Sequence, residues 1–459
     1  MAEGADTSPA ARFADRRILV VGVGIAGESA ARALIGGGVA VELTAAAEDG
    51  SVAALVRAGA HWLGALTAVP QGVDLVVTSP GVPPRDPLLV DAAQRGILVW
   101  GEVELAWRLR GADAAPWLAL TGTNGKTTTV HMLESILRVS GLRTVAVGNV
   151  GESVIDAVLS GAAYDVLAVE LSSQQLHFAP SLVPAAGALL NLAPDHLTWH
   201  GSMDAYVDAK TAVWAGPIAI GNADDPLVAA RLPAGAITFT LRRPGAGQVG
   251  VADGRLVSNA FGDDDLTLAS AADVRPAGAH NVANALAAAA LARAHGVPAA
   301  AVAEGLRTFV PDPHRNQAVA RRDGVDWVDD SKATNPHAAA ASLASYPRIV
   351  WIAGGQLKGV LIDELVAATA QRLAGVVLLG QDRDVVAAAL ARHAPDVPVI
   401  TVRSTDDGAM TEVVRTAAGL ARPGDTVLLA PAGASYDMFT GYAARGAAFE
   451  AAVCALDSP

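Results

Sequence analysis

Cysteine is almost absent from this chain of 459 residues, because Cys454 is its only thiol. A single thiol cannot form an internal disulfide, which is typical of proteins from a reducing compartment. The chain also lacks an uninterrupted apolar run of about 20 residues, the length that a membrane-spanning helix needs. Residues 1–15 contain no apolar signal-peptide core. We therefore expect a cytoplasmic protein without a membrane partner.

Basic charge is also scarce, since 33 Lys and Arg residues stand against 46 Asp and Glu residues, a net charge of −13. Binding to nucleic acid or to an anionic membrane would require a basic face, so both are excluded as general functions. Hydrophobic residues make up 52% of the chain and charged residues 17%, which describes a globular protein with large cores. The length exceeds that of one core, and about three domains are expected.

Strand-like and helical segments alternate along the chain, which is typical of parallel sheets with crossover helices. Strands are predicted at 18–21, 39–43, 75–78, 97–100, 117–120, 145–147, 166–170, 188–191, 325–328, 349–353, 376–379, 399–402 and 426–430. Helices are predicted near 28–35, 51–58, 87–94, 203–214, 280–293 and 299–307, a β-richer patch near 236–268, and a linker at 311–313. The predicted fold class is α/β with three domains: Rossmann-like at 1–108, P-loop ATPase-like with a mainly parallel sheet at 109–311, and Rossmann-like at 312–459.

The most informative segment is PWLALTGTNGKTTT at 116–129. A strand-like run leads into the loop Gly122-Thr123-Asn124-Gly125, and Lys126-Thr127-Thr128 opens a stretch with helical periodicity. A helix N-terminus presents unpaired N–H groups and a positive dipole end, so the loop suits phosphate. Lysine can reach the β/γ-phosphates, and the Thr127 hydroxyl can ligate Mg²⁺. Leu120 stands where the strict pattern has its first glycine, so this is a shortened variant, and a purely structural turn is the alternative.

A second glycine-rich loop, Gly22-Val23-Gly24-Ile25-Ala26-Gly27, follows the first predicted strand. It matches a dinucleotide fingerprint, but an NAD site would want an acid at the tip of the second strand, which here ends in Thr44. This favours a cradle for a diphosphate or nucleotide sugar over an NAD(P) site, and glycines required only for packing are a third interpretation. Ser79-Pro80-Gly81 lies on the same carboxyl edge, although by itself it indicates only a turn.

Further polar residues follow apolar strands or lie on helices of the second predicted domain. Glu170 closes a strand beside the P-loop strand, where it can ligate Mg²⁺ or be a solvated strand-end acid. Asp195-His196 follows the next strand, and a histidine there is more often an orienting or acid–base group than a metal ligand. His200 is left open between a functional and a structural role. Lys210, on the helical run 203–214, reads by itself as a solvated lysine.

His280 and Asn284 share a face of the helix predicted at 280–293, with Asn281 between them. An amide can pair with an adenine edge, although an ordinary polar face explains these residues too.

Polar loops gather in the last third of the chain. They follow the linker or predicted strands and comprise His314-Arg315, DDSKATN at 329–335, GGQLKG at 354–359 and AGAS at 432–435. Together they suggest a substrate face, and each singly could be a turn.

These motifs resemble the Mur ligase family of peptidoglycan synthesis, and in particular its D-glutamate-adding branch. The resemblance covers nearly the whole chain and rests on TGTNGKTTT, ELSS at 170–173, DH at 195–196, HNVANALAA at 280–288 and DDSKATN at 329–335. It implies domains that bind UDP, ATP and the amino acid. It also implies a cytoplasmic, monomeric, ADP-forming ligase that adds D-glutamate to UDP-N-acetylmuramoyl-L-alanine, with no nucleic-acid partner.

The resemblance further implies roles for individual residues. The UDP substrate would contact Gly22, Gly24, Ile25, Ala26, Gly27, Thr44, Ser79, Pro80, Gly81 and Asn149. ATP would contact Gly122, Thr123, Asn124, Gly125, Lys126, Thr127, Thr128, Asn281, Asn284, Arg315 and Asp330. Two Mg²⁺ ions, for which Mn²⁺ could substitute, would be bound by Thr127, Glu170, His196 and a CO₂-derived carbamate on Lys210. D-glutamate would contact Lys332, Thr334, Lys358, Ser435 and Tyr442, and the catalytic residues would be Lys126, His196, Lys210 and Asn149.

The implied chemistry has two steps. The alanyl carboxylate attacks the γ-phosphate of ATP and gives an acyl phosphate and ADP. The amine of D-glutamate then attacks that carbonyl, and the tetrahedral intermediate collapses to an amide and phosphate. Two positions depart from the family pattern: Thr44 stands where relatives usually carry an acid near uridine, and Tyr442 stands at a place associated with Phe.

Other functions compete with this one. A sister Mur ligase adding a different amino acid is the nearest rival, and the DSKATN stretch and the compact first domain argue against it. Folylpolyglutamate synthase shares the ATP core but lacks a UDP-binding first domain. From other classes, an NAD-dependent oxidoreductase and a non-catalytic nucleotide sensor remain. The chain keeps nearly every polar residue that ligase chemistry would need, which disfavours the sensor.

Overall fold

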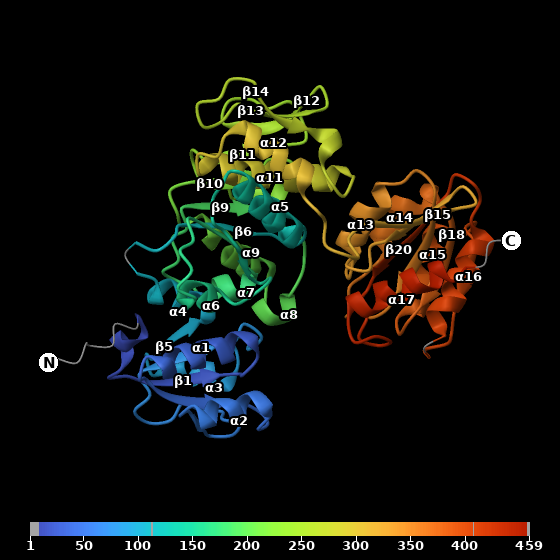
Figure 1. The fold of residues 1–459 in the computed structure, drawn as a ribbon. Coiled ribbons are helices and arrows are strands. Elements are labelled where there is room, and N and C mark those ends of the chain that lie inside the picture. Colours follow the sequence, from blue (N-terminus) through green and yellow to red (C-terminus); the bar gives the residue numbers. More distant parts are fainter. Residues whose placement is uncertain (1–8, 112, 407, 457–459) are drawn as a thin grey trace. The chain divides into compact units, whose positions relative to one another are not determined.

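The computed structural model describes residues 9–111, 113–406 and 408–456. Residues 1–8, part of the segment in which no signal peptide is expected, lie outside the described residues. The chain divides into two compact units, Met1–Asp273 with Ala283–Phe309 and Val274–Val282 with Val310–Pro459. The first unit contains two sheets and the second contains one (Figure 1).

The first sheet has five strands in the order β3-β2-β1-β4-β5, and every pairing is parallel. Its elements are η1 (Pro9–Phe13), β1 (Arg17–Val21), α1 (Ile25–Gly36), β2 (Ala40–Thr44), α2 (Gly50–Arg57), β3 (His61–Trp62), β4 (Leu75–Thr78), α3 (Pro87–Gln94), β5 (Leu98–Gly101) and α4 (Glu102–Leu109). The strand order reverses between β1 and β4, and in open α/β sheets ligands bind at the carboxyl ends beside such a reversal.

The second sheet has nine strands in the order β14-β13-β12-β11-β10-β9-β6-β8-β7. Its elements are β6 (Trp117–Thr121), α5 (Lys126–Val139), β7 (Ala146–Gly148), α6 (Val154–Leu159), β8 (Leu167–Glu170), α7 (Ser173–His177), β9 (Ala186–Leu189), α8 (Leu197–His200), α9 (Met203–Thr211), η2 (Ala212–Trp214), β10 (Ala219–Asn222), α10 (Pro226–Ala229), β11 (Ile237–Phe239), β12 (Gln248–Ala252), β13 (Arg255–Ser258), β14 (Leu266–Ser270), η3 (Ala271–Asp273), α11 (Ala279–Ala294) and α12 (Ala299–Thr308). Strand β6 pairs in parallel with β8 and β9, so three carboxyl ends meet beside the P-loop.

The third sheet has six strands in the order β15-β16-β20-β17-β18-β19, parallel except at the β15–β16 hairpin. Its elements are β15 (Gln317–Arg322), β16 (Val325–Asp329), α13 (Pro336–Ala344), β17 (Ile349–Gly354), α14 (Asp363–Thr369), η4 (Ala370–Arg372), β18 (Leu373–Leu379), α15 (Arg383–His393), β19 (Val399–Thr401), α16 (Ala409–Leu420), β20 (Thr426–Ala432) and α17 (Tyr442–Cys454). The carboxyl ends of β16, β20 and β17 therefore lie on one edge.

Continuous apolar runs explain why strands β4, β6, β17 and β20 lie in the interior of their sheets. All residues of β4, β6, β17 and β20 are buried, as expected of parallel strands covered by helices on both faces. The alanine-rich run 285–292 of α11 is fully buried. On α12, a Cβ added at Gly305 would lie 2.5 Å from the Cα of Ile136 in α5, so small residues here permit close helix packing. Within the described residues, no helix is both long and apolar enough to cross a membrane.

Several features differ from the sequence-based prediction, and strands β3 and β10 are among those not predicted. The strand predicted at 188–191 is β9, Ala186–Leu189, because Asn191 has left the sheet and its side chain binds the P-loop. The β15–β16 hairpin was not predicted, although its turn, Asp323-Gly324, has φ values of 51° and 77° at its two residues. Such a turn is preferred where a two-residue loop joins twisted antiparallel strands. The other predicted strands agree with the structure to within three residues at each end.

Candidate active site

The P-loop joins β6 to α5 in the first unit. Gly125 is the N-cap of α5 with a φ of +81°, a left-handed conformation that favours glycine. The Lys126 ammonium donates hydrogen bonds to the carbonyls of Gly122 and Thr123, each at 3.0 Å, so it lies back over the loop. The first turn of α5 and this ammonium together present positive charge where phosphate would bind.

The amide side chain of Asn191 fixes the shape of the P-loop. Its Oδ1 accepts a hydrogen bond from the Asn124 N–H at 2.8 Å, and its Nδ2 donates to the Asn124 carbonyl at 3.0 Å. Asn191 lies just after β9, the parallel neighbour of β6. In the sequence Asn191 looked like an ordinary strand residue, because nothing local shows that it lies beside the P-loop.

Lys210 is buried beneath the same loop, with 2% of its surface exposed, so its interpretation as a solvated lysine is wrong. Its Nζ donates to the Gly122 carbonyl at 2.8 Å and to the Thr121 hydroxyl at 3.2 Å. Burial, and then the nearby Lys126 charge, hold its pKa well below the ordinary value, against the opposing effects of Asp195 and Glu170. A lysine shifted toward the neutral amine is a nucleophile rather than a simple counter-ion.

Glu170, at the end of β8, is fully buried, so its interpretation as a solvated strand-end acid is also wrong. Its Oε1 accepts a hydrogen bond from the Asn149 side chain at 2.8 Å, and its main-chain carbonyl accepts from the Asn149 N–H at the same distance. Its Oε2 is buried and has no hydrogen-bond partner among the described residues. A buried carboxylate oxygen in this state suits a cation, so the site fits the Mg²⁺ that the motifs imply.

His196 and His200 lie at the two ends of the segment that leads into α9. His196 has a φ of 51°, its Nε2 lies 3.6 Å from Asp195 Oδ2, and half of its side chain is exposed. His200 instead contacts Trp199 and Tyr206, and its Nε2 lies 2.9 Å from the Ser173 hydroxyl. Burial, with smaller effects from other cations, lowers the pKa of His200 to about 4. The structure therefore gives His200 a packing role and leaves His196 accessible.

Two more residues reach the P-loop from other elements. The Tyr206 hydroxyl lies 2.8 Å from the Thr123 hydroxyl, a contact that the sequence did not reveal. Asn284, on α11, approaches so closely that a Cβ added at Gly125 would lie 2.4 Å from its Oδ1. Asn281 is also buried, and its Nδ2 lies 3.5 Å from the Ala277 carbonyl. The structure therefore brings Asn284, one of the predicted adenine contacts, to the loop.

The predicted UDP loops meet at the reversal of the first sheet. The Ser79 hydroxyl donates to the Gly22 carbonyl at 2.8 Å, and a Cβ added at Gly27 would lie 1.9 Å from that same carbonyl. Ile25 is 81% exposed at the start of α1 and offers an apolar surface beside the loop. Thr44 is buried, and its hydroxyl donates to the Gly64 carbonyl and accepts from the Leu66 N–H. Thr44 thus fixes the next loop in place.

In the second unit, the predicted D-glutamate residues follow β16, β17 and β20. The Lys332 ammonium lies 3.8 Å from the centre of the Tyr442 ring, and Thr334 donates its N–H to the Lys332 carbonyl at 2.8 Å. Ser435 is buried, whereas Lys358 is exposed with a φ of 54°. The structure brings Lys332 and Tyr442 into direct contact.

Asp330 and Arg315 are the predicted ATP contacts of this unit. Asp330 accepts hydrogen bonds from the Asn316 N–H at 3.1 Å and from the Ser342 hydroxyl, and burial raises its pKa to about 6. Arg315 donates to Asp312 at 3.3 Å.

Arg445 was not predicted from the sequence. It is buried on α17 and donates three hydrogen bonds, to the Ser331 hydroxyl, the Ser331 carbonyl and the Gly433 carbonyl. It joins two of the predicted loops, DDSKATN and AGAS. An arginine on an alanine-rich helix far along the chain carries no local signal of this contact.

Comparison with known proteins gives two family matches. Residues 120–292 match the Mur ligase middle domain, and residues 314–433 match the glutamate ligase domain of Mur ligases. The chain is 54% identical to UDP-N-acetylmuramoylalanine--D-glutamate ligase of Streptomyces coelicolor, over 96% of this chain and 98% of that protein. The same identity and coverage hold for the enzyme of that name from Thermobifida fusca.

Solved structures share the fold. UDP-N-acetylmuramate-alanine ligase of Thermotoga maritima has a TM-score of 0.57 and 19% identity, covering 96% of this chain and 100% of its own. A pseudomurein peptide ligase type C of Methanothermus fervidus has a TM-score of 0.59 and 19% identity, covering 95% of this chain and 99% of its own.

Proposed function

The chain belongs to the Mur ligase family, and from that premise we propose that it joins D-glutamate to UDP-N-acetylmuramoyl-L-alanine in an ATP-dependent, ADP-forming reaction. The observation that carries the proposal is the 54% identity to D-glutamate ligases over 96% of this chain. The family resemblance of the motifs is thereby confirmed. The mixed α/β fold with mainly parallel sheets is confirmed as well.

The reaction needs a site that binds a triphosphate and brings a carboxylate to it. Lys126 and the N–H groups at the start of α5 would hold the phosphates, because phosphoryl transfer depends mainly on positioning and neutralisation of charge. Glu170, Thr127 and His196 would hold Mg²⁺, for which the Glu170 Oε2 is available. When bound, Mg²⁺ supplies positive charge that reduces repulsion between the substrate carboxylate and the γ-phosphate.

Attack of the alanyl carboxylate on the γ-phosphorus forms a C–O–P linkage and releases ADP. The D-glutamate nitrogen then forms the C–N bond, loses a proton, and phosphate leaves with the former carboxylate oxygen. Lys332, Thr334, Lys358, Ser435 and Tyr442 would hold the amino acid, and two lysines suit its two carboxylates. Asn149, fixed on Glu170 by two hydrogen bonds, would orient the substrate near the reacting carbon.

Carbamylation of Lys210 is part of the proposal. The lowered pKa supports it, because a neutral amine can attack CO₂, form the N–C bond and lose a proton to give an anionic carbamate. In that form the residue would supply a carboxylate to a second Mg²⁺ site. Mn²⁺ would substitute for Mg²⁺ in the same oxygen-rich setting.

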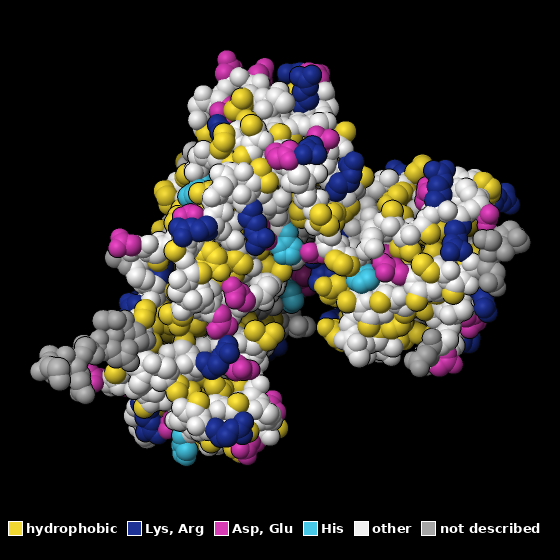
Figure 2. All heavy atoms as spheres, in the orientation of Figure 1, with side chains coloured by type: hydrophobic (Ala, Val, Ile, Leu, Met, Phe, Trp, Pro, Cys, Tyr) yellow, Lys and Arg dark blue, Asp and Glu magenta, His cyan; other side chains and the backbone are white. Residues whose placement is uncertain are grey.

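The remaining proposals concern organisation. Domains at 1–108, 109–311 and 312–459 are supported by the three sheets, whose strands fall within these three ranges. We also propose a cytoplasmic monomer that binds neither nucleic acid nor membrane. Acidic and basic side chains are interspersed on the face drawn in Figure 2, which supports the absence of a general polyanion partner.

The test is a phosphate-release assay with ATP, Mg²⁺ and UDP-N-acetylmuramoyl-L-alanine, with each candidate amino acid supplied in turn. Release that depends on D-glutamate is expected. Release with L-alanine, a diamino acid or a dipeptide instead would move the chain to a sister Mur ligase activity. No ATP turnover with any of them would overturn the ligase assignment.

A further inference from the structure

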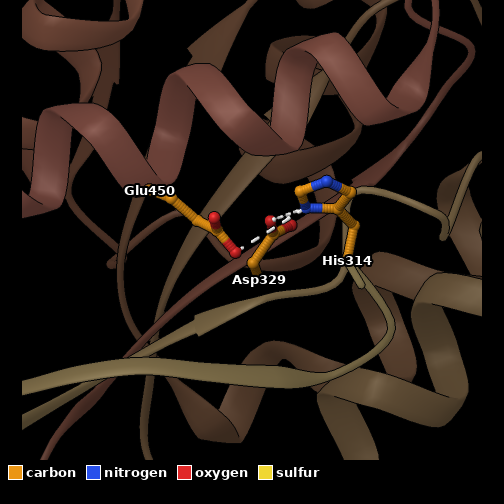
Figure 3. Close-up of side chains that lie close together, drawn as sticks. All are labelled: His314, Asp329 and Glu450. Carbon is orange, nitrogen blue, oxygen red and sulfur yellow. Dashed lines mark hydrogen bonds and ion pairs between the residues drawn. The ribbon is translucent and has the colours of Figure 1, made fainter. Parts of the chain in front are cut away.

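Three side chains from separate elements converge in the second unit (Figure 3). His314 follows the predicted linker, Asp329 ends β16, and Glu450 lies on α17. The His314 Nδ1 lies 2.6 Å from Asp329 Oδ2 and 3.8 Å from Glu450 Oε1. The Asp329 side chain is fully buried and that of His314 nearly so. Neither Asp329 nor Glu450 has a role in the proposed function.

The cluster has the composition of a metal site, but its atoms are already engaged in hydrogen bonds. Asp329 Oδ1 accepts from the Ser331 N–H at 2.8 Å, and Glu450 Oε1 accepts from the Gln317 side chain at 2.7 Å. The backbone of α17 fills the adjoining space, since a Cβ added at Gly446 would lie 2.3 Å from His314 Nδ1 and 2.7 Å from Asp329 Oδ2. This favours an Nδ1–H that donates to a buried carboxylate.

The pair joins two loops that also share two other hydrogen bonds. The His314 carbonyl accepts from the Lys332 N–H at 3.2 Å, and the Asn316 N–H donates to the Asp330 carboxylate at 3.1 Å. His314 and Asn316 both have left-handed backbone conformations, with φ values of 63° and 48°. A turn with two such residues needs support from its surroundings. Arg315 lies between them.

We propose that His314 and Asp329 are a positioning pair that holds the turn at 314–316 against the loop at 329–332. Through this contact the pair sets the placement of Arg315 and Asp330, assigned to ATP, together with that of Lys332, assigned to D-glutamate. The identity of the two ligands rests on the proposed function. The pair itself touches neither substrate and acts through the residues that do.

The test compares variants of the full-length enzyme by the KM values for ATP and D-glutamate. His314→Ala removes the donor and is expected to raise both KM values about tenfold, because displacing a binding group by less than an ångström weakens the contacts made with it. His314→Asn is expected to restore most of the loss, since its amide N–H lies close to the Nδ1 position and asparagine tolerates the left-handed backbone. Glu450→Gln is the matched control: it keeps an oxygen for Gln317 and should change neither KM by more than about twofold.

Asp329→Asn provides a second test if His314→Ala does not fold. It retains an acceptor for the Ser331 N–H but removes the charge, and both KM values should rise together. Thermal unfolding shows whether a change is merely structural: a lower Tm with both KM values unchanged would overturn the proposal. Stoichiometric Zn²⁺ in the purified enzyme, with KM values that rise when it is chelated, would show that the cluster is a metal site and would overturn the proposal.

The outcome is separable from that of the proposed function. The proposed function is judged on the wild-type enzyme, by whether D-glutamate supports phosphate release. The pair is judged on the ratio of the variant's KM values to those of the wild type, measured with whichever amino acid the wild type accepts. A wild type that fails with D-glutamate therefore leaves the test of the pair intact, and a variant with unchanged KM values leaves the ligase assignment intact.

Discussion

The carboxyl edges of the second and third sheets differ in how fully their buried carboxylates are hydrogen-bonded within the protein. At the P-loop edge, formed by 121–127, Glu170, Asn191 and Lys210, a carboxylate oxygen is buried without a partner among the described residues. At the third-sheet edge, formed by 329–335, 354–359 and 432–435, the buried Asp329 and Asp330 carboxylates accept hydrogen bonds at both oxygens. The first edge, proposed for phosphate and metal, would thus be completed by its ligands, whereas the second, proposed for the amino acid, is held in shape by its own side chains.

This difference is typical of the two tasks. A metal and a polyphosphate supply strong charges, so a site for them can leave protein charges unbalanced until they arrive. A small amino acid supplies fewer contacts, and its recognition depends on polar groups that are already in place.

Lys126→Ala should have the largest effect, because it removes the cation at the start of α5 while the loop is still held by Asn191. We expect ATP turnover to fall about a thousandfold or more, with an unchanged circular dichroism spectrum. Arg138→Ala on the same helix is the control, since the Arg138 side chain is 61% exposed and its loss should leave the rate unchanged. Normal turnover in the Lys126 variant would refute the P-loop assignment.

Lys210→Ala should lower the rate about a hundredfold or more, and added formate or acetate should restore part of it by supplying the missing carboxylate. Arg231→Ala removes a cation that contacts α9 only from the surface, through Asp204 and Asp208, and serves as the control. Phosphate release is measured at a series of carboxylate concentrations. Full activity of Lys210→Ala without any additive would eliminate the carbamate from the proposal.

Asp330→Asn should change how stability depends on pH. Burial raises the folded-state pKa of Asp330 from 3.8 to about 6, so between these values the folded chain binds more protons than the unfolded chain. The stability associated with this group is therefore fully present below about pH 4 and is lost as the pH rises to about 6, by an amount on the order of 2–3 kcal/mol. Because asparagine does not titrate, the variant should lose this dependence of stability on pH.

Hydrogen exchange of the 314–334 segment between pH 4 and pH 7 measures the effect locally. Asp326→Asn, on strand β16 just before Asp330 but half exposed, is the control and should preserve the wild-type dependence of stability on pH. An identical slope in wild type and Asp330→Asn would mean that Asp330 is not the buried carboxyl responsible.

Tyr442→Phe should have the smallest effect. The Lys332 ammonium lies over the ring, and phenylalanine presents the same face, so the KM for D-glutamate should change by less than about twofold. Tyr442→Ala removes the ring and should raise that KM about fivefold, which corresponds to roughly 1 kcal/mol for a partly exposed cation–π contact. A large effect of the Phe variant would show that the hydroxyl, rather than the ring, contacts the substrate.

Local patterns predicted the sheets well, because apolar runs, glycines and turn residues act within a few positions of one another. Strand β4 and helix α3 begin and end where they were predicted. The family resemblance predicted roles for Lys126 and Glu170 from motifs that are contiguous in sequence. The hairpin at 317–329 was missed although Asp323-Gly324 gave a usable turn signal.

The contacts that could not be predicted join residues far apart in the chain. Nothing near Lys210 indicates that its helix packs beneath the P-loop, some 88 residues earlier in sequence. Arg445 binds Ser331 across 114 residues, and Asn191 binds Asn124 across 67. Which face of a helix is covered depends on the order of strands in the sheet, and one sequence without its fold does not supply that order.

The two hydrogen bonds from Asn191 to Asn124 bear on how nucleotide is recognised. A glycine-containing loop would ordinarily lose much of its freedom when phosphate orders it. Here the Asn191 side chain, just after β9, already holds the loop in shape without nucleotide. We therefore expect that little of the nucleotide affinity is offset by ordering the loop.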